Sequence, residues 1–303
     1  MALEKEIWRT DIVGNLYKDN EFLTRATNAD QYVLAGKVVH IPNANAASGA
    51  VKNRSSLPAS VTKRTDIDVV YALDEYTSNP ILVPNLDEIQ LSYDKRESVM
   101  SEDMSAIKQL VAEWMLRNWA PTTAAQFLRT TGAAVTGAAD SATGNRKGLT
   151  KEDVRKARTL LNKQNIPKAG RVALIPSDQM DFLLSDADLL KRDYAQEIDM
   201  KGGVITRLFG FDLLERSSTL VYTNASTPVV KDPGDAGAAA DNQAALFWHP
   251  SAVERALGTV DVFERLGDPT YFGDIFSFLL MAGGRQRRND GKGIVAVIEA
   301  ASA

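Results

Sequence analysis

The stretch that most constrains the fold of this chain is SEDMSAIKQLVAEWMLRNW, residues 101–119. Its apolar side chains recur every three or four residues, a spacing that gathers them on one face of an α-helix. The expected buried stripe consists of Met104, Ile107, Val111 and Met115, broadened by Leu110 and Trp114. Ser101 is the expected N-cap, and Pro121 follows the expected end of the helix. The sequence therefore predicts one long amphipathic helix that must pack against another surface.

A long hairpin is predicted ahead of this helix. The alternating stretches KVVHI, which begins at Lys37, and DIDVVYA, residues 66–72, favour two strands joined by a polar tip. In the second strand Ile67, Val69 and Tyr71 share one face. Leaving three large apolar side chains in water forfeits about 1.5 to 3 kcal/mol each, and an isolated two-stranded ribbon is marginally stable at best. We expect this face to be covered, either by its own domain or by a neighbouring subunit.

The middle of the chain alternates helix and strand patterns, which is typical of an α/β module. Thr150 is expected to cap a helix over residues 151–165, and Asp153 completes a capping box. A short apolar strand at 171–175 follows, and then a helix that begins with Ser177 as its cap.

Residues 223–243 hold few large apolar groups and are predicted to form a mobile surface loop. The closing part is predicted to contain a short helix at 251–257 and strands at 259–265, 275–281 and 294–298. The Asn-Asp-Gly sequence at 289–291 favours a hairpin between the last two strands. The basic residues before it, Arg285, Arg287 and Arg288, fit either a solvated hairpin end or a contact with another subunit.

Composition excludes several classes of protein. The 35 basic and 39 acidic residues give a net charge of -4, so there is no extended positive footprint for gripping nucleic acid. The absence of cysteine excludes disulfides and thiolate chemistry. The charged N-terminus does not fit a signal peptide, and no run approaches the roughly 18 apolar residues of a membrane span.

No catalytic constellation stands out. The sequence has no phosphate loop or dinucleotide fingerprint, and His40 and His249 lack metal-ligand spacing. Acidic residues are frequent, but a sequence does not fix the separation of about 5 to 9.5 Å that paired glycosidase carboxylates require. We predict no catalytic, cofactor-binding or metal-binding residues. A hydrolase that uses His249 or scattered acids, and a DNA-binding regulator, remain as alternatives from other classes.

Four segments carry a resemblance to a known family. They are AGKVVHIPN from residue 35, SYDKRESVMSED from residue 92, GGVITRLFGFDLLERSS from residue 202, and FWHPSAVERALGTVDVFERLGDPTYFGDIFSFLLMAGGRQRR from residue 247. With the order of arm, hairpin, long helix, α/β module and closing strands, the chain resembles a tailed-bacteriophage major capsid protein of the Hong Kong 97 type. The encapsulins, shell proteins of bacterial nanocompartments, share that fold and are the alternative.

The resemblance implies an α+β (mixed α/β) fold with an N-terminal arm, an extended loop hairpin, a peripheral domain with a long spine helix, and an axial domain. The expected ranges are 1–36 for the arm, 37–80 for the extended loop, 81–124 and 246–303 for the peripheral domain, and 125–245 for the axial domain. The spine helix is residues 101–119, with its core at Met104, Ile107, Val111 and Met115.

The resemblance also implies partners. Such subunits assemble with themselves as hexamers and pentamers into an icosahedral virion shell around packaged DNA, held without sequence specificity and without a membrane, in the cytoplasm of the bacterial host. A portal at one vertex and decoration or head-completion proteins are further expected partners. Only about 35 residues precede the extended loop, so the scaffolding protein is expected to be separate. No acceptor pairs with Lys52 or Lys63, so no covalent crosslink is expected.

Inter-subunit contacts are expected at Ile67, Val69, Tyr71, Arg285, Arg287 and Arg288. Exposed charge pairs contribute little to stability, so the apolar hairpin face should matter more than the three arginines. We expect damage to the spine-helix core to unfold the subunit, and damage to the hairpin face to impair only the shell.

Overall fold

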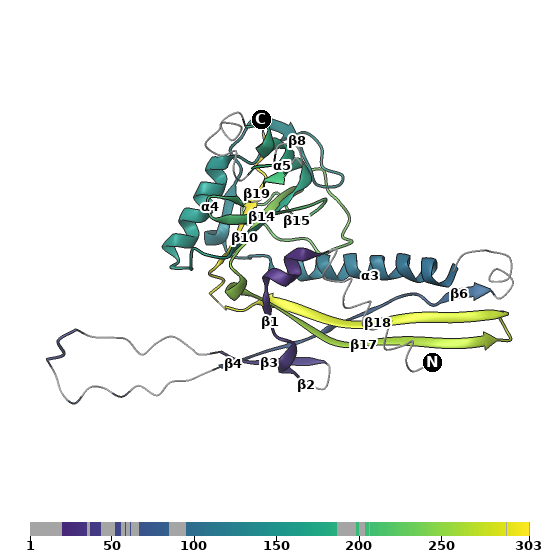
Figure 1. The fold of residues 1–303 in the computed structure, drawn as a ribbon. Coiled ribbons are helices and arrows are strands. Elements are labelled where there is room, and N and C mark those ends of the chain that lie inside the picture. Colours follow the sequence, from purple (N-terminus) through teal and green to yellow (C-terminus); the bar gives the residue numbers. More distant parts are fainter. Residues whose placement is uncertain are drawn as a thin grey trace.

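Two large β-sheets, a long helix and a protruding hairpin dominate the described part of the chain (Figure 1). The computed structural model describes residues 20–34, 37–43, 52–55, 58, 61, 67–84, 95–186, 198–199, 204–205, 207–288 and 290–302. One sheet has seven strands and lies beyond one end of the long helix, whereas the other has five strands and runs alongside that helix. In Figure 1 the hairpin extends to the left, whereas the far end of the five-stranded sheet lies to the right.

The seven-stranded sheet has the order β13-β14-β10-β16-β19-β7, and β15 also pairs with β16. Its strands are β7 (Phe127–Arg129), β10 (Arg171–Pro176), β13 (Arg207–Leu208), β14 (Phe211–Arg216), β15 (Leu220–Tyr222), β16 (Asn242–Trp248) and β19 (Ile294–Ile298). The central strands β10, β16 and β19 are buried at every residue. Such uninterrupted burial is typical of strands that are covered on both faces.

The two faces of this sheet are covered by different elements. Alternate residues such as Ala173, Phe247 and Val295 pack against helices α4 (Lys151–Lys163) and α5 (Ser177–Leu184). The intervening residues, among them Leu174 and Leu246, face the end of helix α3 (Lys95–Trp119) and the 3-10 helix η1 (Glu21–Arg25). The period-two alternation of side chains thus separates two cores.

The five-stranded sheet is built on one very long hairpin. Strands β17 (Val253–Asp268) and β18 (Gly273–Gln286) pair antiparallel, and β18 pairs in turn with β5 (Asp74–Thr77) and β6 (Ile81–Pro84). Strand β1 (Thr27–Asn28) pairs parallel with β17. Helix α3 lies along β18 (Figure 1). Ile107, Val111 and Met115 are buried in this contact and Met104 packs at its edge, whereas Leu110 is 41% exposed.

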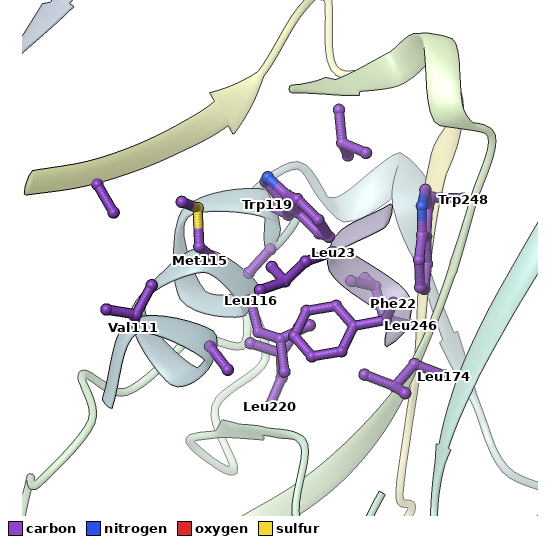
Figure 2. Packing of buried hydrophobic residues seen from close by; sticks show 14 of the residues in the cluster. Phe22, Leu23, Val111, Met115, Leu116, Trp119, Leu174, Leu220, Leu246 and Trp248 are labelled. Atoms are coloured by element: carbon purple, nitrogen blue, oxygen red, sulfur yellow. The ribbon is translucent and has the colours of Figure 1, made fainter. Parts of the chain in front are cut away.

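A core of aromatic side chains joins the two sheets (Figure 2). The ring centroid of Trp119, at the end of α3, lies 5.9 Å from those of both Phe22 and Trp248. Its indole Nε1 donates a hydrogen bond of 2.9 Å to the carbonyl of Glu254 on β17. A Cβ at Gly284 would lie only 2.7 Å from the backbone carbonyl oxygen of Glu254 and 2.6 Å from the sulfur of Met115, so this closely packed position favours glycine.

The remaining described elements are short. The protruding hairpin consists of β3 (Val38–Asn43) and β4 (Ile67–Ala72), with β2 (Val33–Leu34) beside β3. The others are the strand pairs β8 (Ala134–Thr136) with β9 (Asn145–Lys147) and β11 (Ile198–Asp199) with β12 (Val204–Ile205), and the 3-10 helices η2 (Asp30–Tyr32), η3 (Ala124–Gln126) and η4 (Pro250–Ala252).

Several predicted elements are confirmed. The hairpin pairs β3 with β4 as expected. The helix α4 begins at Lys151 with the predicted capping box between Thr150 and Asp153. Strand β19 has the predicted bounds. Residues 223–241 form irregular structure, although Val230 and Asp241 within them are buried.

Other expectations were wrong. Helix α3 begins at Lys95, so Ser101 lies inside it and is not the N-cap. The predicted helix at 251–257 is strand from Val253 onward, because these residues pair with the end of β18. The predicted hairpin between the last two strands does not form, since β18 and β19 belong to different sheets. The predicted domain ranges stay predictions: residues 294–298, which they group with the peripheral domain, pair with β16 in the seven-stranded sheet.

Candidate assembly surfaces

The root of the protruding hairpin is attached to its own chain. Tyr71, opposite Val39 in the strand register, packs half-buried against a cluster of Ala29, Val39, Leu73, Ala256 and Met281. The guanidinium carbon of Arg285 lies 5.9 Å from the centre of the Tyr71 ring, within the range of a cation–π interaction. The neighbouring Val70 points to the other face and is 47% exposed. At its root, the Tyr71 face is therefore covered within the subunit.

The side chains of Ile67 and Val69 lie outside the described residues. Their backbone positions in β4 are fixed by pairing with Asn43 and Ile41. Their predicted contact with a neighbouring subunit stays a prediction.

A buried carboxyl group lies beneath this root. Glu254 is 1% exposed, and burial raises the pKa of its carboxyl group, against the opposing effect of Arg285 and Arg287. Burial and the nearby Glu254 also raise the pKa of the Tyr71 hydroxyl, while Arg285 acts in the opposite direction. Within the described part of the chain, the Tyr71 hydroxyl and Glu254 Oε1 are buried without hydrogen-bond partners. The hairpin thus joins the body beside two buried polar atoms that lack hydrogen-bond partners.

The three predicted arginines do not form one surface. Arg285 is half-buried beside Tyr71, and its Nε donates to the carbonyl of Gln286 at 3.0 Å. Arg287 is exposed. Arg288 is also exposed, and it holds Asp290 with two hydrogen bonds, of 2.9 Å from Nε and 2.7 Å from Nη2. These bonds are the largest reason why the pKa of Asp290 lies well below its usual range.

The far end of the β17–β18 hairpin carries large apolar side chains in the open. Four of them form what we call the tip patch, with exposed fractions of 54% for Phe263, 46% for Leu266, 57% for Tyr271 and 78% for Phe272. Single exposed apolar residues are ordinary, but four of them within residues 263–272 make this end of the hairpin a candidate interaction site. Sequence reasoning missed this patch, although the aromatic pair beside the Gly-Asp-Pro turn at 267–269 could have signalled it.

The tip patch rests on an ordered turn. The buried Asp268 accepts a hydrogen bond of 2.7 Å from the backbone N–H of Thr270, and the Arg265 guanidinium lies 2.9 Å from its carboxylate. Phe272 has a φ of +53°, in the left-handed region that favours glycine. The turn therefore holds Phe272, which is 78% exposed, in a backbone conformation that costs free energy.

The structure does not favour the hydrolase alternative. His249 Nδ1 lies 2.7 Å from Ser251 Oγ and Nε2 lies 3.2 Å from the carbonyl oxygen of Ala169, whereas in a Ser-His-Asp triad Nε2 faces the serine and Nδ1 faces a carboxylate. His249 also accepts a bond from the backbone of Ser251 and so caps η4. Burial lowers the pKa of His249. These contacts describe a structural histidine.

Neither a metal-binding cluster nor a membrane-spanning helix is present among the described residues. The described histidine, aspartate and glutamate side chains do not gather in any group of three or more that could hold a metal ion. Among the described helices, none has the length and apolar character needed to cross a membrane.

Comparison with known families decides the class. A family model described as "Phage capsid protein" matches residues 11–264, which is well over half of the chain. The chain belongs to the phage capsid protein family. No curated protein sequence matched. The family match favours the phage shell over the encapsulin alternative.

Solved capsid structures share the fold of this phage capsid protein. The structure from Mycobacterium phage Che8 is 20% identical, with a TM-score of 0.60 over 91% of this chain and 90% of that chain. The capsid of cyanophage P-SCSP1u is 16% identical, with a TM-score of 0.64 over 91% and 87%. That of Ralstonia phage GP4 is 16% identical, with a TM-score of 0.63 over 92% and 87%. The protein is a major capsid protein of the virion shell with a Hong Kong 97-type fold, as its sequence predicted.

Proposed function

We propose that this capsid protein assembles as hexamers and pentamers that close into an icosahedral head around the genome, and that it catalyses no reaction. The observation that carries the proposal is the tip patch, because a chain with well-filled cores elsewhere leaves four large apolar side chains exposed at one place. A neighbouring copy would cover them. Heterologous contacts repeated by rotation close into rings.

Different parts of the subunit would have different roles in the shell. We assign the seven-stranded sheet to the axial domain, within the predicted range 125–245 but extended to include β19. The five-stranded sheet apart from β5, together with α3, would form the peripheral domain, and residues 37–80, which include β5, would form the extended loop that reaches a neighbour. The arm would be residues 1–36. The covered root at Tyr71 supports an extended loop that is anchored at its base.

The wider partners follow from membership of the family. We propose assembly in the cytoplasm of the bacterial host on a separate scaffolding protein, with a portal at one vertex and room for decoration or head-completion proteins. Packaged DNA would be confined by the wall without sequence-specific contacts, which agrees with a net charge of -4.

Assembly of the purified protein tests the proposal. Subunits, with a scaffold added where one is needed, should form capsomers or shells in electron micrographs. Replacing Phe263 and Phe272 by serine should raise the concentration needed for assembly, whereas Leu110→Ser, which removes an exposed apolar side chain from the helix α3, should not. A protein that stays a monodisperse monomer under every condition would contradict the proposal.

The hairpin face has its own test. Val69→Asp should impair assembly and leave the circular dichroism spectrum of the subunit unchanged, because it places a charge on the face predicted to meet a neighbour. Val70→Asp is the matched control on the opposite face. Normal shells from Val69→Asp would show that this face makes no essential contact.

A further inference from the structure

The two faces of the seven-stranded sheet carry surfaces of opposite charge. We define the basic surface as Arg158, Lys163 and Lys168, which lie on α4 and the loop after it. We define the acidic pocket as the cavity that α3 and residues 216–241 line on the other face.

The basic surface belongs to a segment whose charge contrasts with that of the whole chain. Residues 151–171 hold two acidic residues, Glu152 and Asp153, and seven basic ones, Lys151, Arg155, Lys156, Arg158, Lys163, Lys168 and Arg171. Arg155 and Lys156 have local partners, since they lie 2.6 Å from Glu152 and 3.0 Å from Asp153. The three residues of the basic surface are exposed, and within the described chain they form no ion pair.

A buried guanidinium holds this surface in place. Arg171, which is 2% exposed, donates hydrogen bonds to Asn162 Oδ1 at 2.9 Å and to the carbonyls of Ile166 and Pro167 at 2.7 and 2.8 Å. These acceptors belong to the end of α4 and the turn that follows it, which would otherwise leave free carbonyls. Lys163 and Lys168 are therefore presented on a fixed support.

The acidic pocket is a cavity of about 180 Å³. Five acidic residues line it, namely Glu113, Asp140, Asp232, Asp235 and Asp241, against the three basic residues Arg117, Arg216 and Lys231. The basic residues are engaged, because Arg117 pairs with Asp232, Lys231 lies 2.7 Å from Asp241, and Arg216 lies 3.9 Å from Glu113. Within the described residues, the exposed Asp140 and Asp235 have no basic partner.

The sheet prevents these two surfaces from meeting within one subunit. The apolar face of α4 packs on one side of the sheet, whereas Leu220, Tyr222 and Val230, which flank the pocket, pack on the other. Figure 1 shows α4 and α3 on opposite sides of the seven-stranded sheet. A second copy, placed beside the first by rotation, would bring the basic surface of one subunit to the pocket of the next.

We propose that the basic surface and the acidic pocket are the two halves of a heterologous contact between neighbouring copies of this chain. Side chains of Lys163 and Lys168 would reach Asp140 and Asp235 of the next subunit. This inference rests on the proposed shell function. It gives the contact between neighbouring subunits of a ring a fixed direction. Complementary charges fix the register of such a contact and repel the reverse orientation, in which like charges would meet.

Charge reversal tests the contact. One variant carries Lys163→Glu and Lys168→Glu, a second carries Asp140→Lys and Asp235→Lys, and a third combines all four substitutions. Each of the first two should raise the protein concentration needed for assembly about tenfold, as expected for the loss of about 1.4 kcal/mol of binding free energy. The combined variant should assemble like the unmodified protein, because every interface again pairs opposite charges.

Controls separate the outcomes. Glu21→Lys with Glu75→Lys reverses two exposed charges away from both surfaces and should assemble normally, and all variants should keep the subunit's circular dichroism spectrum. The proposed contact would be overturned if the variant with all four substitutions assembled poorly. It would also be overturned if both variants with two substitutions assembled normally. If the variant with Lys163→Glu and Lys168→Glu forms normal empty shells but retains less DNA, the basic surface binds DNA instead. If the unmodified protein forms no shells, the proposed function itself fails.

Discussion

The two sheets of this capsid protein differ in how completely the chain covers them. The seven-stranded sheet is buried on both faces by α3, α4, α5 and η1, and its central strands expose almost nothing. The five-stranded sheet has helix α3 along part of β18, but its far end leaves the tip patch in the open. The first sheet therefore holds the subunit together, while the second leaves apolar surface exposed, which we propose is used for association. Substitutions in each should affect different measurements.

The largest effect is expected where the two sheets meet. Trp119→Ala would remove a fully buried side chain that contacts Phe22 and Trp248, and truncating such a residue costs about 3 to 5 kcal/mol. Chemical denaturation of unassembled subunits measures this loss. The control Leu110→Ala, on the exposed side of the same helix, should change stability by about 0.5 kcal/mol or less. Equal effects of the two substitutions would contradict the assignment of the core.

The next largest loss of stability is expected on α4, which packs on the seven-stranded sheet. Asp153 is fully buried and accepts hydrogen bonds from Thr131, Thr150 and Lys156. Asp153→Ala would leave these donors unpaired and should destabilise the subunit by about 2 to 4 kcal/mol. Asp178→Ala, an exposed acid in the first turn of α5, is the control and should cost under about 1 kcal/mol.

The pH dependence of Asp153 gives a second measurement. Burial alone would raise the pKa of its carboxyl group, but the bonds from Thr131, Lys156 and Thr150 outweigh burial and lower it. The folded pKa therefore lies below the unfolded value of 3.8, so this stabilisation is present above that value and is lost as the pH falls through the folded pKa. The Asp153→Ala variant should lack this part of the acid sensitivity.

Local patterns predicted the local features of this structure. The capping box of α4, the pairing of β3 with β4 and the bounds of β19 depend on residues close in sequence, and these expectations were correct. The partners of β18 and β19 depend on contacts between distant segments, and the Asn-Asp-Gly signal at 289–291 predicted a hairpin where the chain instead crosses from one sheet to the other. Sequence periodicity does not contain that information.

The candidate surfaces show the same limit. The apolar stripe of the spine helix could be read from spacing, and Ile107, Val111 and Met115 are buried. Spacing could not predict that Arg285 covers Tyr71 or that the tip patch is exposed, because each depends on where separate strands end. The basic surface and the acidic pocket also required the fold, since a net charge of -4 conceals a local excess of either sign.

A smaller effect is expected at the base of the five-stranded sheet. Burial raises the pKa of the Glu254 carboxyl group, with Arg285 and Arg287 opposing it. The folded subunit then binds a proton more tightly than the unfolded chain, so stability falls as the pH rises from the unfolded pKa of 4.5 through the folded pKa. Glu254→Gln removes this titration. Its Tm relative to the unmodified protein should therefore rise as the pH increases above 4.5, which thermal unfolding at a series of pH values measures.

The smallest change in stability separates folding from association at the tip patch. Phe272 has a φ of +53°, so Phe272→Gly should relieve backbone strain. Glycine also loses more conformational freedom on folding, which offsets part of this gain, so the net stabilisation of the subunit should be about 0.5 kcal/mol. The same substitution removes a side chain that is 78% exposed and should raise the concentration needed for assembly, measured by light scattering. Phe272→Ala is the matched control, since it removes the ring and keeps the positive φ. Both variants should assemble poorly, and only the glycine variant should gain stability, because only it relieves the backbone; equal assembly of all three proteins would mean that the tip patch has no partner in the shell.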